Sequence, residues 1–511
     1  MKKNKGENNI INNIIKILIL LLAIILQIIV LIFLYGATST LSEYAKIIFQ
    51  IIKFTSVLYI IYKNQNPAYK IVWIILMMFL PIAGFVVYLL WGNNKTPKKI
   101  KTKITEEKKH LLSLLNKNDQ ILETIENSDR KKEAKFIING TNYPIYNNSK
   151  IEYLKIGEYY YEKLLQDLKK AKEYILIEYF IISDGKMWNE IYEILKEKRK
   201  ENVKIYIIYD ALGSILKKPK DLKEQLQSIG IEYLAFNPLT PFIRSYINYR
   251  DHRKIVVIDG KVGYTGGINI GDEYINLTHR LGHWKDCGIR IEGEGIKNLI
   301  SIFFTLWNMN NKNVNYEEYI KNIKQTTKTQ GYIIPFSDNP HNKINPMQNS
   351  YINIINNAQK YVYIMTPYLI LDSETEQALI NTSLSGINIK IITPYIPDKK
   401  LVNACTKSFY GKLLEAGIEI YEYKPGFIHS KVILSDDEVS IVGTANFDFR
   451  SFYLNYECGI WMYSTLEELN IKKDFEETLK QCEKIELKVW EKRKLDIRII
   501  EALLRLISPL L

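Results

Sequence analysis

Apolar residues are concentrated at the N-terminal end of the chain. Three long apolar segments cover residues 17–35, 47–62 and 71–91. The first is almost purely aliphatic, with Gln27 as its one strongly polar residue. A helix of this length, rising ~1.5 Å per residue, crosses a ~30 Å hydrocarbon core. The pattern therefore predicts a transmembrane helical region over residues 1–92, with two to three hydrophobic segments.

Basic residues that flank these segments indicate which side of the membrane the flanking parts of the chain lie on. Lysines follow the last segment at positions 95, 98, 99, 101, 103, 108 and 109. Basic residues are enriched on the cytoplasmic side of membrane segments, so we expect a multi-pass protein of the cell membrane with a cytoplasmic catalytic part. The N-terminus carries lysines as well, at positions 2, 3 and 5, so it too is expected on the cytoplasmic side. Three full spans would put the two ends on opposite sides of the membrane, so both expectations cannot hold with three spans. One segment would then be re-entrant or interfacial. A cleaved signal peptide is disfavoured because further apolar segments follow.

Further along, short apolar strands alternate with amphipathic helices, and the whole series occurs twice. The first strands cover 171–182 and 358–369, and the next pair 203–210 and 387–394. Such alternation predicts α/β layers. Because these strands are apolar on both faces, we expect helices on both sides of each sheet. The fold class is therefore α/β, with two α/β sandwich repeats packed as a pseudo-dimer within one chain.

These elements divide the rest of the chain into three parts. We expect a polar linker with some helix over residues 93–150 and a first repeat over residues 151–330. The second repeat would cover residues 331–511 and end in an amphipathic helix at about residues 485–506.

One short motif occurs at the same place in both repeats. A histidine, a lysine and an aspartate are found at identical spacing as His252, Lys254 and Asp259, and again as His429, Lys431 and Asp436. An asparagine follows at the same offset in each copy, and an acidic residue comes later: Asn269 and Asn446, then Asp286 and Glu457. One copy alone is weak evidence, but two copies with matching offsets inside a repeat are improbable by accident.

The residue types suit chemistry on a phosphodiester. Residues i and i+2 of a strand point to the same face, so the histidine and lysine of each motif project together. If the repeats pack about a pseudo-twofold axis, two imidazoles, two ammonium groups and two amides meet in one cleft. Lysines and asparagines would stabilise charge on the phosphate oxygens. One imidazole could attack phosphorus while the other protonates the leaving oxygen.

The acidic residues fall into two kinds. Asp286 and Glu457 could orient the imidazoles through their second ring nitrogens. Asp259 and Asp436 belong to the catalytic motif, but they come just past their strands. We therefore expect these two aspartates to hold loops more than to take part in chemistry.

Composition narrows the function further. Among 511 residues, 69 Lys and Arg against 56 Asp and Glu give a formal net charge of +13. This balance suggests an anionic partner, either nucleic acid or a membrane with acidic lipid. A hydrophobic share of 47% excludes a disordered protein. The four cysteines form no C-x-x-C pair, so neither a zinc site nor a disulfide framework is indicated.

Taken together, these residues resemble the phospholipase D superfamily, and more closely the bacterial cardiolipin synthase family. The resemblance rests on both His-Lys-Asp motifs and on residues 66–92, 250–260, 264–274, 366–368, 443–451 and 505–511. The chain departs from the family at Cys287, where a hydroxyl residue is usual, and at residues 335–338, where a Ser-Gly-Pro stretch is common. Neither departure touches a catalytic group.

The resemblance implies that two phosphatidylglycerol molecules give cardiolipin and glycerol through a phosphohistidine. His252 would be the nucleophile and His429 the general acid and then base, an order taken from the family because the two motifs are nearly symmetric. The phosphate would be bound by Lys254, Lys431, Asn269 and Asn446. No metal or cofactor is expected, because the lysines supply the charge. The implied partners are phosphatidylglycerol, other anionic phospholipids and the membrane, with no nucleic acid expected.

Other acceptors for the phosphatidyl group remain open at this point. Water would make a phospholipid hydrolase and serine another headgroup-exchanging transferase, because the choice depends on cleft dryness and headgroup contacts. A nuclease is the next alternative, since the superfamily also cleaves nucleic acid. Nothing in the chain resembles a known nucleic-acid module, however. A non-catalytic membrane adaptor is disfavoured by the two intact motifs.

Overall fold

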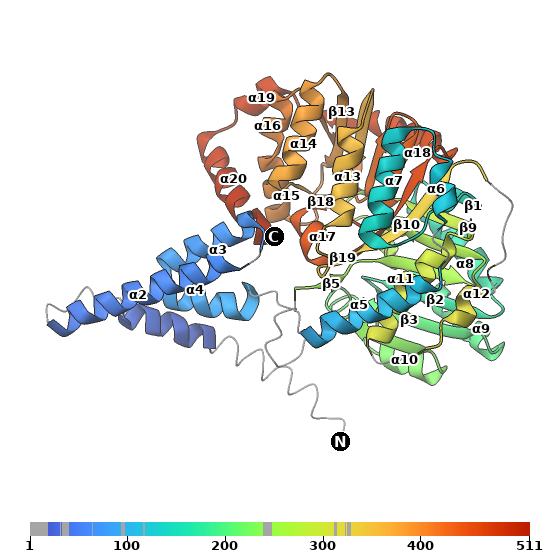
Figure 1. The fold of residues 1–511 in the computed structure, drawn as a ribbon, viewed down its shortest axis with the longest axis horizontal. Helices are drawn as coiled ribbons and strands as arrows, with labels where there is room; N and C mark the ends of the chain where they lie inside the picture. The colour runs from blue at the N-terminus through green and yellow to red at the C-terminus, as the bar shows by residue number, and fades with distance from the viewer. Residues whose placement is uncertain are drawn as a thin grey trace. The chain divides into compact units, whose positions relative to one another are not determined.

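The computed structural model describes residues 19–30, 32, 40–63, 65–92, 98–115, 118–238, 248–310, 314–321, 323 and 329–510. Two compact units are distinguished. The smaller unit consists of Met1–Pro97, Asn237–Tyr249 and Leu506–Leu511, and the larger unit of Lys98–Phe236 and Arg250–Arg505. Figure 1 follows the chain through both in colour. The ends of the first predicted membrane segment, residues 17, 18, 31 and 33–35, lie outside the described residues.

The described part of the smaller unit is mainly helical. Its elements are the helix Ile19–Val30, α2 (Thr40–Tyr62), α3 (Pro67–Phe79), α4 (Pro81–Val87), the π-helix η1 (Tyr88–Gly92) and the 3-10 helix η3 (Ser508–Leu510). Asn66 caps α3, because its side chain accepts a hydrogen bond from the backbone of Ala68. The third predicted segment is broken at Pro81, since proline lacks the N–H that a continuous helix requires.

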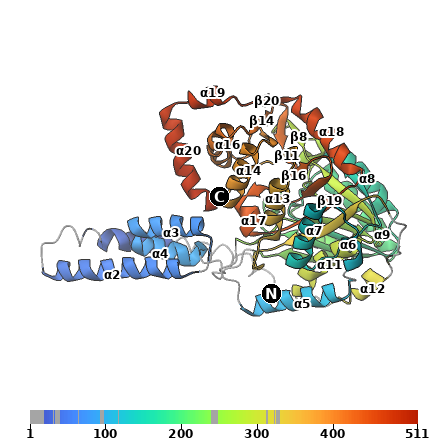
Figure 2. The same ribbon diagram turned by 45° about the horizontal axis from the view of Figure 1, so that its top comes forward.

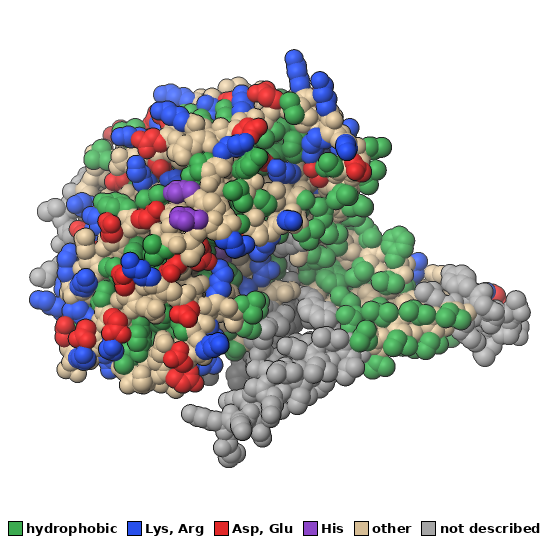
Figure 3. Space-filling view, turned by 180° about the vertical axis from the view of Figure 1, so that it is seen from behind, with side chains coloured by type: hydrophobic (Ala, Val, Ile, Leu, Met, Phe, Trp, Pro, Cys, Tyr) green, Lys and Arg blue, Asp and Glu red, His purple; other side chains and the backbone are tan. Residues whose placement is uncertain are grey.

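Within the described ranges, one helix is long and apolar enough to cross a membrane, over Glu43–Tyr62. The helices Ile19–Val30 and Pro67–Phe79 are apolar but shorter. Figure 3 shows apolar side chains over the outer surface of the smaller unit's helices, the reverse of the usual arrangement in water. An N-terminal apolar helix is thus confirmed, and two to three spans stay a prediction.

The first repeat is built on a seven-stranded mixed sheet. Its strands lie in the order β1 (Ser149–Leu154), β9 (Gly288–Gly293), β7 (Val262–Gly266), β6 (Lys254–Ile258), β2 (Tyr174–Tyr179), β3 (Lys204–Asp210) and β4 (Glu232–Phe236). One face packs on α8 (Gly157–Lys169), α9 (Lys186–Lys200) and α10 (Leu222–Ser228). The other face packs on α11 (Ile296–Met309), which also contacts α12 (Glu317–Lys321). The core between these layers includes the fully buried side chains of Trp188 and Ile177.

The second repeat has the same strand order with one strand added at its far edge. The order is β10 (Tyr332–Asp338), β19 (Asn455–Tyr463), β17 (Val439–Gly443), β16 (Val432–Ser435), β11 (Tyr361–Met365), β13 (Asn388–Pro394), β14 (Glu419–Tyr423) and β20 (Cys482–Lys484). Its helices are α13 (Pro346–Asn356), α14 (Ser373–Leu384), α15 (Lys400–Ser408), α16 (Tyr410–Glu415), α17 (Phe449–Tyr453), α18 (Glu467–Leu479), α19 (Leu487–Glu491) and α20 (Leu495–Ile507). Helices α13 and α18 contact the sheet and can be followed in Figure 2. The predicted pair of α/β sandwich repeats is confirmed.

Much of the predicted linker is helical and packs on the repeats. Helix α5 (Lys98–Ser113) contacts α11, and α7 (Ser128–Thr141) contacts β10 and α13, with the short α6 (Asp119–Glu123) between them. Arg130 of α7 is buried and pairs with Asp436 of the second repeat at 3.0 Å. A buried arginine needs such carboxylate partners, so α7 is part of the second repeat's packing.

Short strands link the two repeats beside the motif histidines. β5 (Arg250–Asp251) pairs in parallel with Asn455 and Tyr456 at the start of β19. On the other side, β8 (His283–Lys285) pairs in parallel with β15 (Gly426–Ile428). A further short pair, β12 (Leu369–Ile370) with β18 (Phe447–Asp448), lies within the second repeat. The backbone just before each histidine is therefore tied to the opposite repeat.

Candidate active site

Both motif histidines lie directly before a central strand of their sheets. Lys254 is the first residue of β6, and Lys431 directly precedes β16. His252 and His429 keep only 8% and 7% of their surface exposed, and both lysines are fully buried. Each lysine Nζ donates to the carbonyl oxygen of its own histidine, Lys254 at 2.5 Å. Each lysine thus lies next to its own histidine, but its ammonium group binds the histidine backbone and not the imidazole.

The two histidines line a single cavity of about 580 Å³. Asn269 and Asn446 line it as well, so four of the predicted site residues meet there from the two repeats. Lys254 and Lys431 are not among the lining residues, because their ammonium groups bind the histidine carbonyls within the protein. They contribute positive charge from behind the imidazoles.

Each imidazole is bound by a carboxylate from the opposite repeat. His252 Nδ1 lies 3.0 Å from both carboxylate oxygens of Glu457. His429 Nδ1 lies 2.6 Å from Oδ2 of Asp286. Both carboxylates are fully buried. Asp286 and Glu457 thus contact the imidazoles as the sequence suggested, and the contacts are exchanged between the repeats.

Backbone and neighbouring side chains hold these pairs in place. The N–H of His252 donates to the carbonyl oxygen of Tyr456 at 2.9 Å, and that of His429 to the carbonyl oxygen of Lys285 at 2.7 Å. Glu457 also accepts a hydrogen bond from Asn455 Nδ2 at 3.0 Å and one from the Thr444 hydroxyl. With Nδ1 occupied in both rings, Nε2 is the nitrogen left for a substrate.

Burial keeps both imidazoles neutral. It lowers the pKa of His252 to about 4, although Glu457 opposes the shift. Burial, together with Lys431 and Lys254, lowers the pKa of His429 well below its usual value. Burial also lowers the pKa of Lys254 to about 7, with Glu457 opposing, and that of Lys431 to about 8, with Asp286 opposing. A bound anion would favour the charged form of all four groups.

The two carboxylates differ in their proton affinity. Burial raises the pKa of Asp286 to about 7, although Lys431 opposes the shift. Burial also disfavours the charged form of Glu457, but His252 and Lys254 outweigh it and lower the pKa of Glu457 below its usual value. The Asp286–His429 pair therefore holds an additional proton more readily than the Glu457–His252 pair does.

The asparagines are held by neighbours of their own. Asn269 Nδ2 donates to the Tyr274 hydroxyl at 2.6 Å, and its Oδ1 accepts from the backbone of Ile181. Asn446 Nδ2 donates to Asp448 Oδ2 at 2.9 Å. Each amide nitrogen keeps a second hydrogen. Phosphate binding by these asparagines stays a prediction.

The two motif aspartates lie away from the cavity. Asp259 accepts hydrogen bonds from the backbone N–H groups of residues 172–174, and Asp436 from those of residues 359–361, all at 2.8–3.0 Å. Both adopt left-handed backbone conformations, with φ of 54° and 59°. They fix the turns that lead into β2 and β11. This geometry supports a role in holding loops, and a catalytic role for the two aspartates stays a prediction.

Several cavity residues were missed by sequence reasoning. Positive side chains from outside the motifs also line the cavity: Lys217, Arg250, Arg280, Lys399 and Arg450. Aromatic rings flank both imidazoles, with Phe180 5.0 Å from His252 and Trp284 5.3 Å from His429 between ring centroids. Arg250 and Arg450 lie within the stretches that carried the family resemblance, which was the one available signal for them. Within the described ranges, no group of three or more His, Cys, Asp or Glu side chains is placed to hold a metal ion.

Two protein families and a solved structure match parts of the chain. The family described as "Cardiolipin synthase, PLD-like domain" matches residues 164–301 and 351–482, one stretch in each repeat. A second family, "Phospholipase_D-nuclease N-terminal", matches residues 51–93. Among solved structures, a phosphatidylserine synthase from Haemophilus influenzae shares the fold, with a TM-score of 0.57 and 16% identity over 74% of this chain and 97% of that one.

Curated relatives cover nearly the whole chain. A "Cardiolipin synthase" from Alkalihalophilus pseudofirmus is 33% identical over 88% of this chain and 91% of its own length. A "Cardiolipin synthase 2" from Bacillus anthracis is 34% identical over 88% of both chains. An uncharacterised protein from Streptococcus mutans is 39% identical over 89% of this chain and 99% of its own length.

Proposed function

The chain belongs to the cardiolipin synthase family of phospholipase D-like enzymes, and on this premise we propose that it joins two phosphatidylglycerol molecules into cardiolipin and glycerol. Membership makes it a phosphatidyltransferase that acts on phospholipids; the particular substrate and the mechanism are our proposal. The observation that carries it is one cavity lined by His252 and His429, each held at Nδ1 by a carboxylate of the opposite repeat.

The proton affinities of the two pairs support the division of roles. Ionised Glu457 accepts the Nδ1 proton of His252, which leaves a lone pair on Nε2 for attack on phosphorus. Protonated Asp286 donates to Nδ1 of His429, which puts the ring proton on Nε2, where a general acid needs it. The order of roles taken from the family thus has support of its own in this chain.

In the first half-reaction His252 Nε2 bonds to the phosphorus of one phosphatidylglycerol, and the bond from phosphorus to the glycerol oxygen breaks. The departing oxygen takes the Nε2 proton of His429, and His429 Nδ1 takes the proton of Asp286. Free glycerol leaves, and the phosphatidyl group stays on His252. The imidazolium formed there faces the Glu457 carboxylate, which lies 3.0 Å from Nδ1.

In the second half-reaction the terminal hydroxyl of another phosphatidylglycerol gives its proton to His429 Nε2. Its oxygen bonds to phosphorus, the phosphorus–nitrogen bond breaks, and His252 regains its lone pair. The proton returns from His429 Nδ1 to Asp286, so the cycle closes with no net change in the enzyme. Throughout, Lys254 and Lys431 offset the phosphate charge from behind the imidazoles, and Asn269 and Asn446 donate to its oxygens.

We place this reaction at the cell membrane, with the catalytic part in the cytoplasm. The apolar helix Glu43–Tyr62 supports anchoring, and the lysines that follow residue 92 support the cytoplasmic side. Helix α20 supports contact with lipid, because Leu495, Ile499 and Leu503 are at least half exposed on it. Protease access to tags at residues 1 and 511, tested from each side of sealed vesicles, would report the topology. It would also show whether the number of spans is odd or even.

The test of function uses the full chain purified in a non-ionic detergent with phosphatidylglycerol micelles. We expect cardiolipin and glycerol in equal amounts, and almost complete loss of both in His252→Ala and in His429→Ala. Mass spectrometry of the intact protein should detect no phosphatidyl adduct in the His252→Ala variant and a slowly formed one in the His429→Ala variant, where glycerol must leave without its acid and at most one glycerol per enzyme is released. Wild-type turnover in either variant would refute the two-histidine mechanism. Phosphatidic acid as the main product would identify a hydrolase, and serine-dependent formation of phosphatidylserine another transferase.

A further inference from the structure

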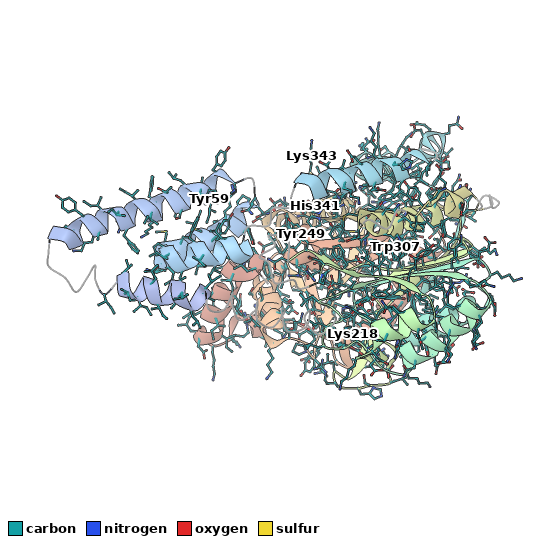
Figure 4. All side chains as sticks on the ribbon, turned by 90° about the horizontal axis from the view of Figure 1, so that it is seen from below. Tyr59, Lys218, Tyr249, Trp307, His341 and Lys343 are labelled. Carbon is teal, nitrogen blue, oxygen red and sulfur yellow. The ribbon has the colours of Figure 1, made fainter. Side chains whose placement is uncertain are left out.

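A second cavity, of about 620 Å³, lies outside the catalytic cavity and shares no lining residue with it. Helix α5 forms one wall, and the loop of residues 339–343 after β10 forms another. Figure 4 shows His341 and Lys343 of this loop beside α5. In the sequence, residues 92–97 separate α5 from the last apolar segment, residues 71–91.

Four lysines surround this second cavity: Lys101, Lys108, Lys109 and Lys343. Among the described residues none of the four forms an ion pair with a carboxylate, unlike many lysines of the larger unit. Lys108 is half-buried above the Tyr143 ring, 5.4 Å from its centroid. Burial lowers the pKa of Lys108 to about 8, with Asp338 opposing. An anion in this cavity would supply the partner that these ammonium groups lack.

The rest of the lining is partly polar, with Thr105, Asn142 and His341 among its residues, and partly apolar. Ile104 and Leu115 are buried, and Leu112 and Pro144 complete the apolar surface. A free phosphate would gain nothing from this surface, whereas a ligand with a hydrocarbon chain would bury area against it. The combination of a lysine rim and an apolar floor therefore matches an anionic amphiphile.

The loop that carries Lys343 is held in place. Asp338 at its start accepts hydrogen bonds from the backbone of Asn339 and from Asn342 Nδ2, both at 2.7 Å. His341 Nε2 lies 2.8 Å from the hydroxyl oxygen of Tyr456, whose carbonyl oxygen accepts from the N–H of His252. The wall of the cavity is thus preorganised, which reduces the entropy that a ligand must overcome.

We propose that this cavity is a second binding site for an anionic phospholipid, with its phosphate among the four lysines and part of an acyl chain against the apolar floor. The site is separate from the catalytic cavity, so its occupancy does not depend on the proposed reaction.

The test uses the full chain in a neutral detergent, in a His252→Ala background so that the probe is not consumed. The probe is phosphatidylglycerol with a photoreactive group on one acyl chain, and labelled peptides are mapped by mass spectrometry. We expect labels on α5 and on residues 339–343. In Lys101→Gln/Lys109→Gln/Lys343→Gln these labels should fall on the order of 100-fold at low probe concentration, about fivefold per lysine removed.

A matched control removes three exposed lysines that form no ion pair among the described residues, as Lys172→Gln/Lys220→Gln/Lys223→Gln. This control should keep the labels. Labels in the catalytic cavity should persist in both variants, which separates this proposal from the proposed function. Hexadecyl phosphate should displace the probe, and inorganic phosphate at the same concentration should not. Equal labelling by a phosphatidylcholine probe, displacement by inorganic phosphate, or labels unchanged in the triple lysine variant would each overturn the proposal.

Discussion

Replacing Glu457 by glutamine tests the contact between the repeats on which the proposed mechanism depends. The substitution keeps the shape of the side chain and removes its charge. The glutamine oxygen should remain at the Oε1 position, because Asn455 Nδ2 donates to that atom at 3.0 Å. The new amide nitrogen would then lie beside the Thr444 hydroxyl, which can turn to accept it. His252 Nδ1 keeps an acceptor, so the ring should hold its tautomer and orientation.

The expected loss follows from the missing charge. A hydrogen bond to a charged partner contributes about 1.5–3 kcal/mol, and in the proposed reaction this charge would face the imidazolium of the phosphohistidine. Because each ~1.4 kcal/mol changes a rate about tenfold, formation of the phosphohistidine should slow by about 10- to 150-fold. If the amide instead donates to Nδ1, His252 is driven into the wrong tautomer, and the loss would approach about 10⁴-fold.

Single-turnover release of glycerol measures this step directly. Glu133→Gln is the matched control, because Glu133 is also buried and binds Arg130 and Trp461 away from the cavity. That control should lower the thermal stability and leave the rate of glycerol release unchanged. Unchanged glycerol release in Glu457→Gln, or an equal loss in Glu133→Gln, would refute the role given to Glu457.

Further predictions concern pH and the motif aspartates. Lys254 and Lys431 are charged below their pKa values of about 7 and 8 and neutral above them, so kcat/KM should fall as pH rises through this range. A bound phosphodiester raises both pKa values, so kcat should fall only at higher pH. A kcat/KM that stays flat to pH 10 would contradict the role given to the two lysines. Asp259→Ala removes three backbone hydrogen bonds and should cost about 1–3 kcal/mol in thermal unfolding, with turnover per folded molecule unchanged. Asp436→Ala should lower the free energy of unfolding further, because it also leaves the buried Arg130 with one partner fewer. For either variant, a fall in turnover without a fall in stability would contradict the expectation.

Much of the fold follows from local patterns. The apolar strands that begin at residues 171 and 358 are found as β2 and β11, and the duplicated series appears as two sheets with the same strand order. The sequence also placed Lys254 and Lys431 close to their histidines, but only the structure shows that their ammonium groups bind the histidine carbonyl oxygens. The break of the third apolar segment at Pro81 also has a local cause, because proline lacks the N–H that a continuous helix requires.

Contacts between residues far apart in the sequence could be found only from the tertiary structure. The linker pattern did not show that Arg130 binds Asp436, because the partners lie 306 residues apart and each looks solvent-exposed in its own segment. The arginines and lysines that line the cavity come from elements far apart in the sequence, so their meeting in one cavity depends on the tertiary fold.

The sequence by itself determined the apolar start of the chain, the two repeats, and which residues form the motif, because these depend on composition and on short periodicities. The tertiary structure decided which carboxylate serves which imidazole. Glu457 reaches back 205 residues to His252, and His429 reaches back 143 residues to Asp286. Such pairings depend on how two sheets dock, and docking arises from the shape of whole packed surfaces, which no local run of residues encodes.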